Sequence, residues 1–179
     1  DFSGGLGMQW NISEHDDFQA SYAFDQYDKS DYQRITKLDI RDYSNVQNSL
    51  RLLYNHRFDR GDVLTIGSDF MHDYLYNTNL ENETRNQNSW DLFGQYDWRI
   101  SDQWEAVGAV RYDYFSDGKE SHVTPKLNVC YKPIYNLSIR AGYGMGFRAP
   151  TLKEKYYNFD MAGIWIVEGN ANLKSEVSQ

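Results

Sequence analysis

The sequence predicts an all-β fold: an antiparallel transmembrane β-barrel segment of roughly eight strands, each about ten residues long, enough for a tilted strand to cross a bilayer. Three observations predict it. Apolar and polar residues alternate along the chain, aromatic residues gather at the ends of the alternating stretches, and short polar breaks take turns with longer ones. No stretch shows the 3.6-residue repeat of an amphipathic helix.

The alternation defines each strand in order, because successive side chains of a strand point to opposite faces of a sheet. The first run has apolar residues at every second position, namely Leu6, Met8, Trp10 and Ile12. Later runs repeat the pattern, with His56 and Phe93 as exceptions. The predicted strands lie near 6–12, 18–24, 50–58, 64–70, 90–100, 104–114, 123–131 and 137–145.

The connections between these runs differ in length. Short polar breaks occur near 13–17, 59–62, 101–103 and 133–136. They alternate with generally longer polar segments near 28–46, 74–88 and 148–176. Only the connection near 116–121 is short although it lies on the same side as these longer segments. Barrels of the bacterial outer membrane have short periplasmic turns and longer extracellular loops, so this asymmetry favours such a barrel.

The aromatic residues form two rows that match the two interfaces of a membrane, where amphipathic rings lie at headgroup level. One row flanks the short breaks and consists of Trp10, Phe18, Phe58, Trp98, Trp104, Tyr131 and Tyr135. The other row lies at the opposite strand ends and consists of Tyr27, Tyr74, Trp90, Tyr114 and Phe147.

The composition limits the class of partner. The 179 residues carry a formal net charge of −8, which argues against nucleic acid because phosphate binding needs a basic face. The mean hydropathy of −0.76 is compatible with a barrel, in which lipid-facing and lumen-facing residues alternate. The single cysteine, Cys130, excludes an internal disulfide and a cysteine-based metal site. The chain begins at Asp1 without a signal-like segment, so either a leader was removed or this is a piece of something longer.

A soluble antiparallel sheet with one buried face alternates in the same way. Its strands would usually be about five or six residues long, and a small closed soluble barrel would need apolar side chains inside. Here the polar face is strongly charged, with Arg51, Asp91, Arg99, Arg111, Asp113, Lys126 and Arg140. The membrane barrel is therefore the favoured interpretation.

Two motifs follow the last predicted strand. Residues 146–152 read Gly-Phe-Arg-Ala-Pro-Thr-Leu, and residues 169–176 read Gly-Asn-Ala-Asn-Leu-Lys-Ser-Glu. In this order and spacing they resemble TonB-dependent outer-membrane receptors, in which the first motif enters an extracellular loop and the second closes it. Ala171 and Ser175 stand where that family usually has prolines. The residues that carry the resemblance are Phe147, Arg148, Ala149, Pro150, Asn170, Asn172 and Leu173.

The resemblance implies a barrel of about 22 strands around a plugged lumen. Residues 1–179 would then be part of the β-barrel domain, a middle-to-late portion without the plug and the C-terminal strands. It implies active, TonB-energised uptake of a scarce nutrient across the outer membrane of a Gram-negative bacterium. The favoured nutrient is a ferric siderophore, and cobalamin and haem are the alternatives within the family. Haem receptors of the family carry a histidine between the two motifs. This sequence has none between Phe147 and Leu173, which counts against haem.

The implied partners are outer-membrane lipid and lipopolysaccharide, the TonB complex through the absent plug, and a metal chelate or corrinoid as substrate. No cofactor is implied. The candidate ligand-binding residues of the loop are Arg148, Tyr156, Tyr157, Phe159 and Trp165. Arg148 could pair with a plug carboxylate or an anionic ligand, or meet lipopolysaccharide or water. The aromatic residues could stack on a siderophore or corrin, and loop packing or membrane anchoring explains them equally well.

Other features have weaker interpretations. Gly142, Gly144 and Gly146 leave one face of a strand bare, which either permits close approach by a plug or relieves strand curvature. His72 is either an external ligand or a solvated strand-end side chain. The acidic groups Asp25, Asp28 and Asp31, or Glu81 and Glu83, lack the glycine and spacing of a calcium loop, so no metal site is predicted.

No nucleophile with a base, zinc spacing or phosphate loop occurs, so no catalytic residue is predicted and the protein is expected not to be an enzyme. Two rival functions stay open. One is a soluble β-sheet module for binding or adhesion, and the other is a small eight-stranded structural barrel.

Overall fold

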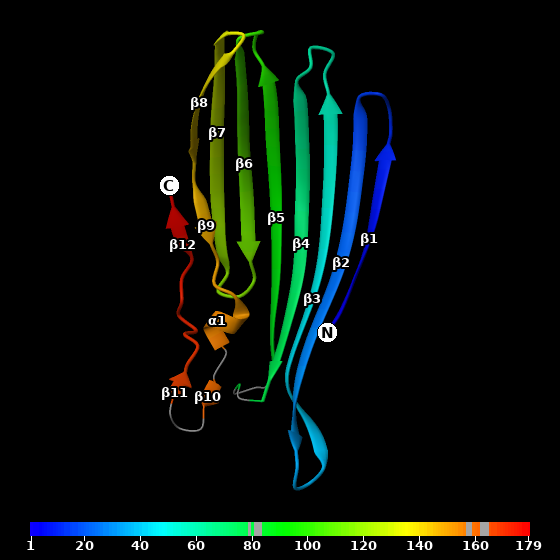
Figure 1. Cartoon of the computed structure of the whole chain (residues 1–179), viewed down its shortest axis with the longest axis vertical. Helices are drawn as coiled ribbons and strands as arrows, with labels where there is room; N and C mark the ends of the chain where they lie inside the picture. The colour runs from blue at the N-terminus through cyan, green and yellow to red at the C-terminus, as the bar shows by residue number, and fades with distance from the viewer. Residues whose placement is uncertain (79, 81–83, 157–158, 162–164) are drawn as a thin grey trace.

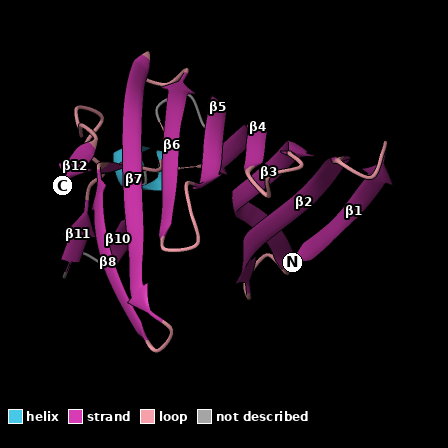
Figure 2. Cartoon of the chain, turned by 90° about the horizontal axis from the view of Figure 1, so that it is seen from above, coloured by secondary structure: helices cyan, strands magenta, loops and turns pink. Residues whose placement is uncertain are grey.

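The computed structural model describes residues 1–78, 80, 84–156, 159–161 and 165–179. Eight strands pair in chain order, each antiparallel to the next, in a single sheet (Figure 1). They are β1 (Phe2–Asn11), β2 (Asp16–Gln33), β3 (Leu38–Arg57), β4 (Val63–Asn77), β5 (Thr84–Arg99), β6 (Trp104–Phe115), β7 (Glu120–Ile134) and β8 (Leu137–Gly144). Viewed along the strands in Figure 2, the sheet is a curved wall that does not close on itself.

Shorter elements follow the sheet. They are β9 (Gly146–Arg148), α1 (Leu152–Tyr156), β10 (Phe159–Met161), β11 (Trp165–Val167) and β12 (Glu176–Ser178). Strand β9 pairs with β12, and β10 pairs with β11, each pair antiparallel. Within the described parts of the chain, no helix is both long and apolar enough to cross a membrane.

The eight predicted strands are confirmed, but β2, β3, β4, β5 and β7 are longer than predicted, and β4 and β5 extend into the polar segment 74–88. Strand β2 has 18 residues and β3 has 20, so most of the polar segment 28–46 is a protruding hairpin and not a loop (Figure 1). Both faces of this hairpin carry polar side chains. The backbone ladder therefore continues there without the apolar alternation from which strands are recognised in a sequence. The short turns all lie at the opposite end of the sheet, which we call the short-turn end, and the hairpin lies at the long-loop end.

The sheet has an apolar face and a polar face, and cross-strand pairs show which residues share a face. Phe70, Trp90 and Tyr114 form one row on the apolar face, while Trp98 lies on the same face near the short turns. Trp90 and Trp98 are eight positions apart, a span of roughly 26 Å along the strand at about 3.3 Å per residue. For a strand tilted by about 40° this is roughly 20 Å along the membrane normal, somewhat less than the apolar band of about 25 Å in outer-membrane barrels.

The predicted aromatic rows are only partly correct. At the short-turn end, Trp104 stacks on Tyr131 with ring centroids 4.3 Å apart. Tyr27, in contrast, lies on the polar face, in one row with Asn45. The sequence places Phe147 in phase with the apolar residues of β8, but the break between β8 and β9 shifts the phase. The Phe147 ring consequently stacks on His122, which shares the polar face with Asp113.

The buried core is small and lies on the polar face at the long-loop end. Tyr43, Leu75, Leu80 and Leu152 form it, and Tyr156 packs against it. Leu75 follows Asp69 and Asp73 at every second position of β4, which places it on the polar face. Helix α1 supplies Leu152, so the segment after β9 folds back across this face of the sheet.

Candidate functional site

The first motif builds the start of helix α1. Thr151 and Glu154 form a capping box, in which each side chain bonds the backbone of the other. The Thr151 Oγ1 accepts from the Glu154 amide at 3.2 Å, and Glu154 Oε2 accepts from the Thr151 amide at 2.9 Å. The Arg148 guanidinium donates to Glu154 Oε1. The hydrogen bond from the Thr151 backbone, together with Arg148, lowers the pKa of the Glu154 carboxyl.

The same helix is anchored to the turn between β6 and β7. The Lys155 Nζ donates to Asp117 Oδ2 at 2.9 Å, and the Tyr156 hydroxyl donates to Asp117 Oδ1 at 3.0 Å. Lys155 is only 5% exposed, so this ion pair is screened little by water. Burial, and then the hydrogen bond to Asp117, raise the pKa of Tyr156. Helix α1 is thus held against the polar face by one buried leucine and one shared carboxylate.

Two cations lie over aromatic rings beside α1. The Arg85 guanidinium carbon is 5.0 Å from the centre of the Tyr156 ring, and the Lys153 Nζ is 5.5 Å from that of Tyr43. Arg85 and Tyr43 come from β5 and β3, so the loop and the sheet build this surface together. A cation over an aromatic face is attracted to the ring by about 0.5–2 kcal/mol. Arg85 and Lys153 thus place two cations beside the apolar cluster, which suits a ligand that carries negative charge.

The second motif closes on the first. The Asn170 amide donates to the Glu154 carbonyl at 3.3 Å, and the Leu173 amide donates to the Asn170 carbonyl at 3.0 Å. Further along, β12 pairs with β9 so that Glu176 lies opposite Arg148. The two motifs, distant in sequence, form one structural unit around α1.

The structure brings only some of the candidate residues together. Tyr156 lies in the anchored helix, and Arg148 is held by Glu154 within the loop. Phe159 and Trp165 lie in the small pair β10 and β11, but their side chains are outside the described residues, as is Tyr157. Ligand contact by these five residues stays a prediction.

The structure also shows what surrounds the remaining motif residues and the glycines Gly142, Gly144 and Gly146. Pro150 is buried, and the Asn170 Oδ1 accepts from the Asn172 amide at 3.0 Å. A Cβ placed on Gly142 would lie 2.4 Å from the Asn128 side-chain oxygen. The glycine therefore leaves room for a side chain of the neighbouring strand β7.

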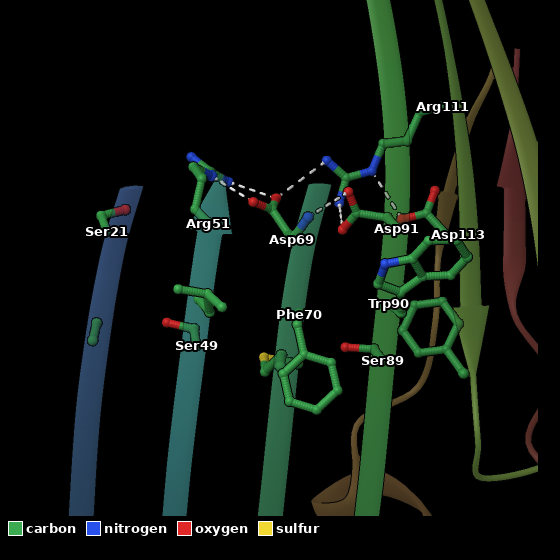
Figure 3. A pocket seen from close by; sticks show the side chains of 14 residues that line it. Ser21, Ser49, Arg51, Asp69, Phe70, Ser89, Trp90, Asp91, Arg111 and Asp113 are labelled. Atoms are coloured by element: carbon green, nitrogen blue, oxygen red, sulfur yellow. Dashed lines mark hydrogen bonds and ion pairs between the residues drawn. The ribbon is translucent and has the colours of Figure 1, made fainter. Parts of the chain in front are cut away.

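A second candidate site is a network of ion pairs across the polar face (Figure 3). Arg51 binds Asp69 with two hydrogen bonds of 2.7 and 2.8 Å. Arg111 donates to Asp91 and Asp113 at 2.8 Å each and lies 3.7 Å from Asp69. Bidentate and shared pairs of this kind fix side-chain orientation as well as charge. The network joins four strands, β3 to β6, at mid-height of the wall.

The network borders a pocket of 430 Å³. Figure 3 shows Ser21 on β2, Ser49 on β3 and Ser89 on β5 along its wall. The sequence placed these charges on one face but gave no sign that two arginines would share three carboxylates.

Among the described residues, no group of three or more His, Cys, Asp or Glu side chains could hold a metal ion. Glu81 and Glu83 lie outside those residues. The sequence leaves two interpretations of His72 open. In the structure its Nδ1 lies 2.7 Å from the Asn88 Oδ1.

Comparison with known families decides what kind of protein this is. A family model described as TonB dependent receptor-like, beta-barrel, matches residues 1–179. This chain belongs to that family. Members of the TonB-dependent receptor family are outer-membrane β-barrels of Gram-negative bacteria; they are receptors and transporters, not enzymes.

Individual relatives agree with the family and its fold. The chain is 28% identical over 128 residues to the vitamin B12 transporter BtuB of Photobacterium profundum, covering 70% of this chain and 20% of that protein. The siderophore receptor PirA of Acinetobacter baumannii superimposes with a TM-score of 0.67 at 16% identity, over 98% of this chain and 30% of that one. A mutant of the ferric enterobactin receptor PfeA of Pseudomonas aeruginosa, in complex with enterobactin, gives 0.70 at 13% identity, over 98% and 31%. The chain spans about a fifth of the transporter and less than a third of either receptor.

Proposed function

We propose that these residues form part of the barrel wall and outer mouth of a receptor that takes up a ferric siderophore across the outer membrane with energy from TonB. The observation that carries the proposal is the position of α1. The segment with both family motifs is anchored across the polar face at the long-loop end through Leu152, Lys155 and Tyr156. In a closed barrel that face lines the lumen, so the segment would narrow the mouth through which a substrate enters.

The exposed apolar face argues against a soluble binding module. Leu92, Leu127 and Ile139 are 47, 53 and 54% exposed, with no second layer of structure over them among the described residues. Large apolar surfaces left exposed mark a membrane or protein contact. The proposal therefore places this face against outer-membrane lipid and, near the long-loop end, against lipopolysaccharide.

A ferric siderophore is favoured as substrate on two grounds. Of the solved structures named above, PirA is described as a siderophore receptor and PfeA as a ferric enterobactin receptor. The mouth also combines the cation Arg85 with the phenol of Tyr156, groups that suit an anionic, oxygen-rich iron chelate. Arg148, Tyr157, Phe159 and Trp165 are proposed as further contacts from the loop.

Cobalamin is the second candidate, and one observation favours it. The vitamin B12 transporter matches at 28% identity, higher than the 16 and 13% of the two siderophore receptors. We propose that the other parts of the receptor lie outside these residues. They are a plug that contacts TonB and further strands that close the barrel.

The test is uptake by the complete receptor in cells without their own receptors. Ferric siderophores labelled with radioactive iron and cobalamin labelled with radioactive cobalt are supplied separately, with and without an uncoupler of the proton gradient. The proposal expects iron uptake that stops with the uncoupler. Uptake of cobalamin alone would establish the second candidate, and uptake that persists without the gradient would contradict energised transport. In the same assay Tyr156→Ala should weaken substrate binding at least about fivefold, whereas Tyr135→Ala, in an exposed short turn, should leave it unchanged.

A further inference from the structure

A histidine of the sheet lies directly beneath the first motif. The His122 ring, at the long-loop end of β7, stacks on the Phe147 ring with centroids 4.4 Å apart and an angle of 17° between the planes. Phe147 also meets the Phe115 ring edge-on at 5.8 Å. The His122 side chain is still 22% exposed, so a proton from water can reach it. The first motif therefore covers one face of a group that can be charged.

The His122 ring has an unpaired nitrogen between two carboxylates. Its Nε2 is buried and has no hydrogen-bond partner among the described residues. The Glu120 Oε2 is 3.7 Å away, too far for a hydrogen bond. Asp113 lies directly opposite His122 in the register of β6 and β7, and its Oδ2 is likewise buried without a hydrogen-bond partner in the described part of the chain. Buried polar atoms left in this state are costly.

The charged groups around the ring include one more carboxylate than cations. Arg111 donates to Asp113 Oδ1 at 2.8 Å, and Lys155 of α1 donates to Asp117 of the β6–β7 turn at 2.9 Å. Glu120 is the third carboxylate of this group. A proton on the ring would bring these charges into balance.

The other charges on the surrounding elements face away from the ring or lie farther from it. Arg148 and Glu176 are opposite each other in β9 and β12, and Arg148 is adjacent to Phe147, so both side chains point to the other side of this strand pair. Lys126 is on the same face of β7 four positions further on, roughly 13 Å along the strand. Lys119 is in the exposed β6–β7 turn.

The second motif contacts the same carboxylate. The Ser175 hydroxyl donates to Glu120 Oε2 at 2.6 Å, the oxygen that lies 3.7 Å from the ring. Ser175 stands where the motif of the family usually has a proline, which has no hydroxyl to donate. Glu120 thus joins the second motif to the histidine beneath the first. We call β9, α1 and β12, with the residues that connect them, the motif segment.

Protonation of the ring changes the contacts that it can make. An imidazolium donates from both ring nitrogens, so Nε2 can close the 3.7 Å gap to Glu120 and form a charge-assisted hydrogen bond. A positive ring is also attracted to the aromatic face of Phe147. The stacking contact exists only while the motif segment lies on the wall, and a proton on the ring therefore stabilises that position. Histidine side chains gain and lose this proton between about pH 5 and 8.

We propose that His122 is a proton-operated latch: its protonated ring holds the motif segment on the wall, and its neutral ring allows the segment to leave the wall more readily. Because the position on the wall binds the proton better, acid strengthens it and the gain is lost as the pH rises. The inference rests on the proposed function only in taking this segment as the border of the mouth, which would then be narrower in acid. The latch itself can be tested without substrate.

The first experiment measures amide hydrogen exchange of residues 146–156 in the complete receptor between pH 5 and 8, corrected for its intrinsic pH dependence. Exchange should rise at least about fivefold from pH 5.5 to pH 8 in the wild type, and should not depend on pH in His122→Gln. Glu154 does not contribute in this range, because its pKa lies below 4.5. The matched control is His15→Gln, at a 49% exposed side chain near the short turns, which should keep the wild-type dependence.

Two further variants separate the charge from the packing. His122→Lys carries a charge throughout this pH range, and its exchange should be equal at pH 5.5 and pH 8. Glu120→Gln still accepts from Ser175 but cannot form the ion pair, and it should reduce the pH dependence by at least about half. If His122→Gln fails to fold, as judged by its mobility in unheated gels, Glu120→Gln serves as the test. A wild type without pH dependence, or a dependence that persists unchanged in the folded variants, would overturn the proposal.

The second experiment measures how fast ferric enterobactin and cobalamin, each supplied separately, associate with the complete receptor at pH 5.5 and pH 7.5. The ratio of the rate at pH 7.5 to that at pH 5.5 should be at least about threefold larger in the wild type than in His122→Gln. Comparison with the variant cancels any protonation of the substrate itself. Equal ratios would overturn the latch as a control of entry. Failure of both probes to bind at either pH, with the expected exchange profile, would instead count against the proposed function alone.

Discussion

Gly169 lies directly against the backbone of Lys155. A Cβ on Gly169 would come within 2.5 Å of the Lys155 carbonyl oxygen and 2.7 Å of the Tyr156 nitrogen, closer than real side chains approach backbone atoms. The glycine of the second motif is therefore required by the helix that the first motif begins. This contact is a physical link between the two motifs.

We expect Gly169→Ala to loosen α1, because the extra methyl group meets backbone atoms that cannot move aside. Overpacking of this kind costs about 1–3 kcal/mol. Amide hydrogen exchange of residues 152–156 in the complete receptor should rise at least about fivefold. Gly108→Ala is the matched control, since its Cβ would meet nothing within 4 Å. Equal exchange in the two variants would show that the contact does not constrain the loop.

Lys155→Met should release α1 from the turn between β6 and β7. Removing one partner of a buried ion pair leaves the other charge without compensation, at a cost of about 3 kcal/mol. Exchange of the helix amides should rise accordingly, while Lys155→Met combined with Asp117→Asn should recover part of the protection. No recovery in the double variant would mean that the ion pair does not anchor the helix.

The cap of α1 should depend on pH through Glu154. The pKa of this carboxyl lies below its ordinary value of 4.5 in the folded loop, so its stabilisation is complete above about 4.5 and is lost as the pH falls through the lowered pKa. Exchange of residues 151–156, corrected for its intrinsic pH dependence, should rise on acidification below pH 4.5. Glu154→Gln should remove that dependence; an unchanged profile in this variant would assign the effect to another group.

Arg111→Met should destabilise the wall of the barrel. It leaves Asp91 and Asp113, which are 8 and 6% exposed in their side chains, without their shared guanidinium. The expected cost is about 3 kcal/mol, measured as a lower midpoint of guanidinium-induced unfolding in detergent. Arg34→Met, in an exposed turn, serves as the control. A midpoint no lower than that of the control would show that the network adds nothing to stability.

The sheet could be predicted from the sequence wherever one face meets an apolar environment. Alternation at residues 90–100 marks β5 because lipid-facing and lumen-facing side chains differ there in polarity. The same rule fails at residues 28–46, where both faces of the β2–β3 hairpin are polar although the backbone ladder continues. It also fails at Phe147, because the break after Gly144 shifts the phase of alternation without a proline or charge to mark it.

The candidate site was only partly predictable for a different reason. The pattern Thr151-x-x-Glu154 announces a helix start in the sequence, but the anchor on Asp117 joins residues 38 positions apart. The same holds for the arginines and carboxylates of the polar face. Alternation places Arg51, Asp91 and Arg111 on one side, whereas their pairing depends on the register between strands, which no local pattern contains.

The proposed function requires that the apolar face meets lipid while the polar face lines a lumen. The most direct test is site-directed spin labelling of single cysteines at positions 90–98 of β5, with Cys130→Ser, in the complete receptor reconstituted in lipid. We expect high accessibility to oxygen at even positions such as Leu92 and Tyr96, and low oxygen accessibility at odd positions such as Asp91 and Phe93. Accessibility without a two-residue period, or a water-soluble nickel reagent reaching the even positions as readily as the odd ones, would contradict it.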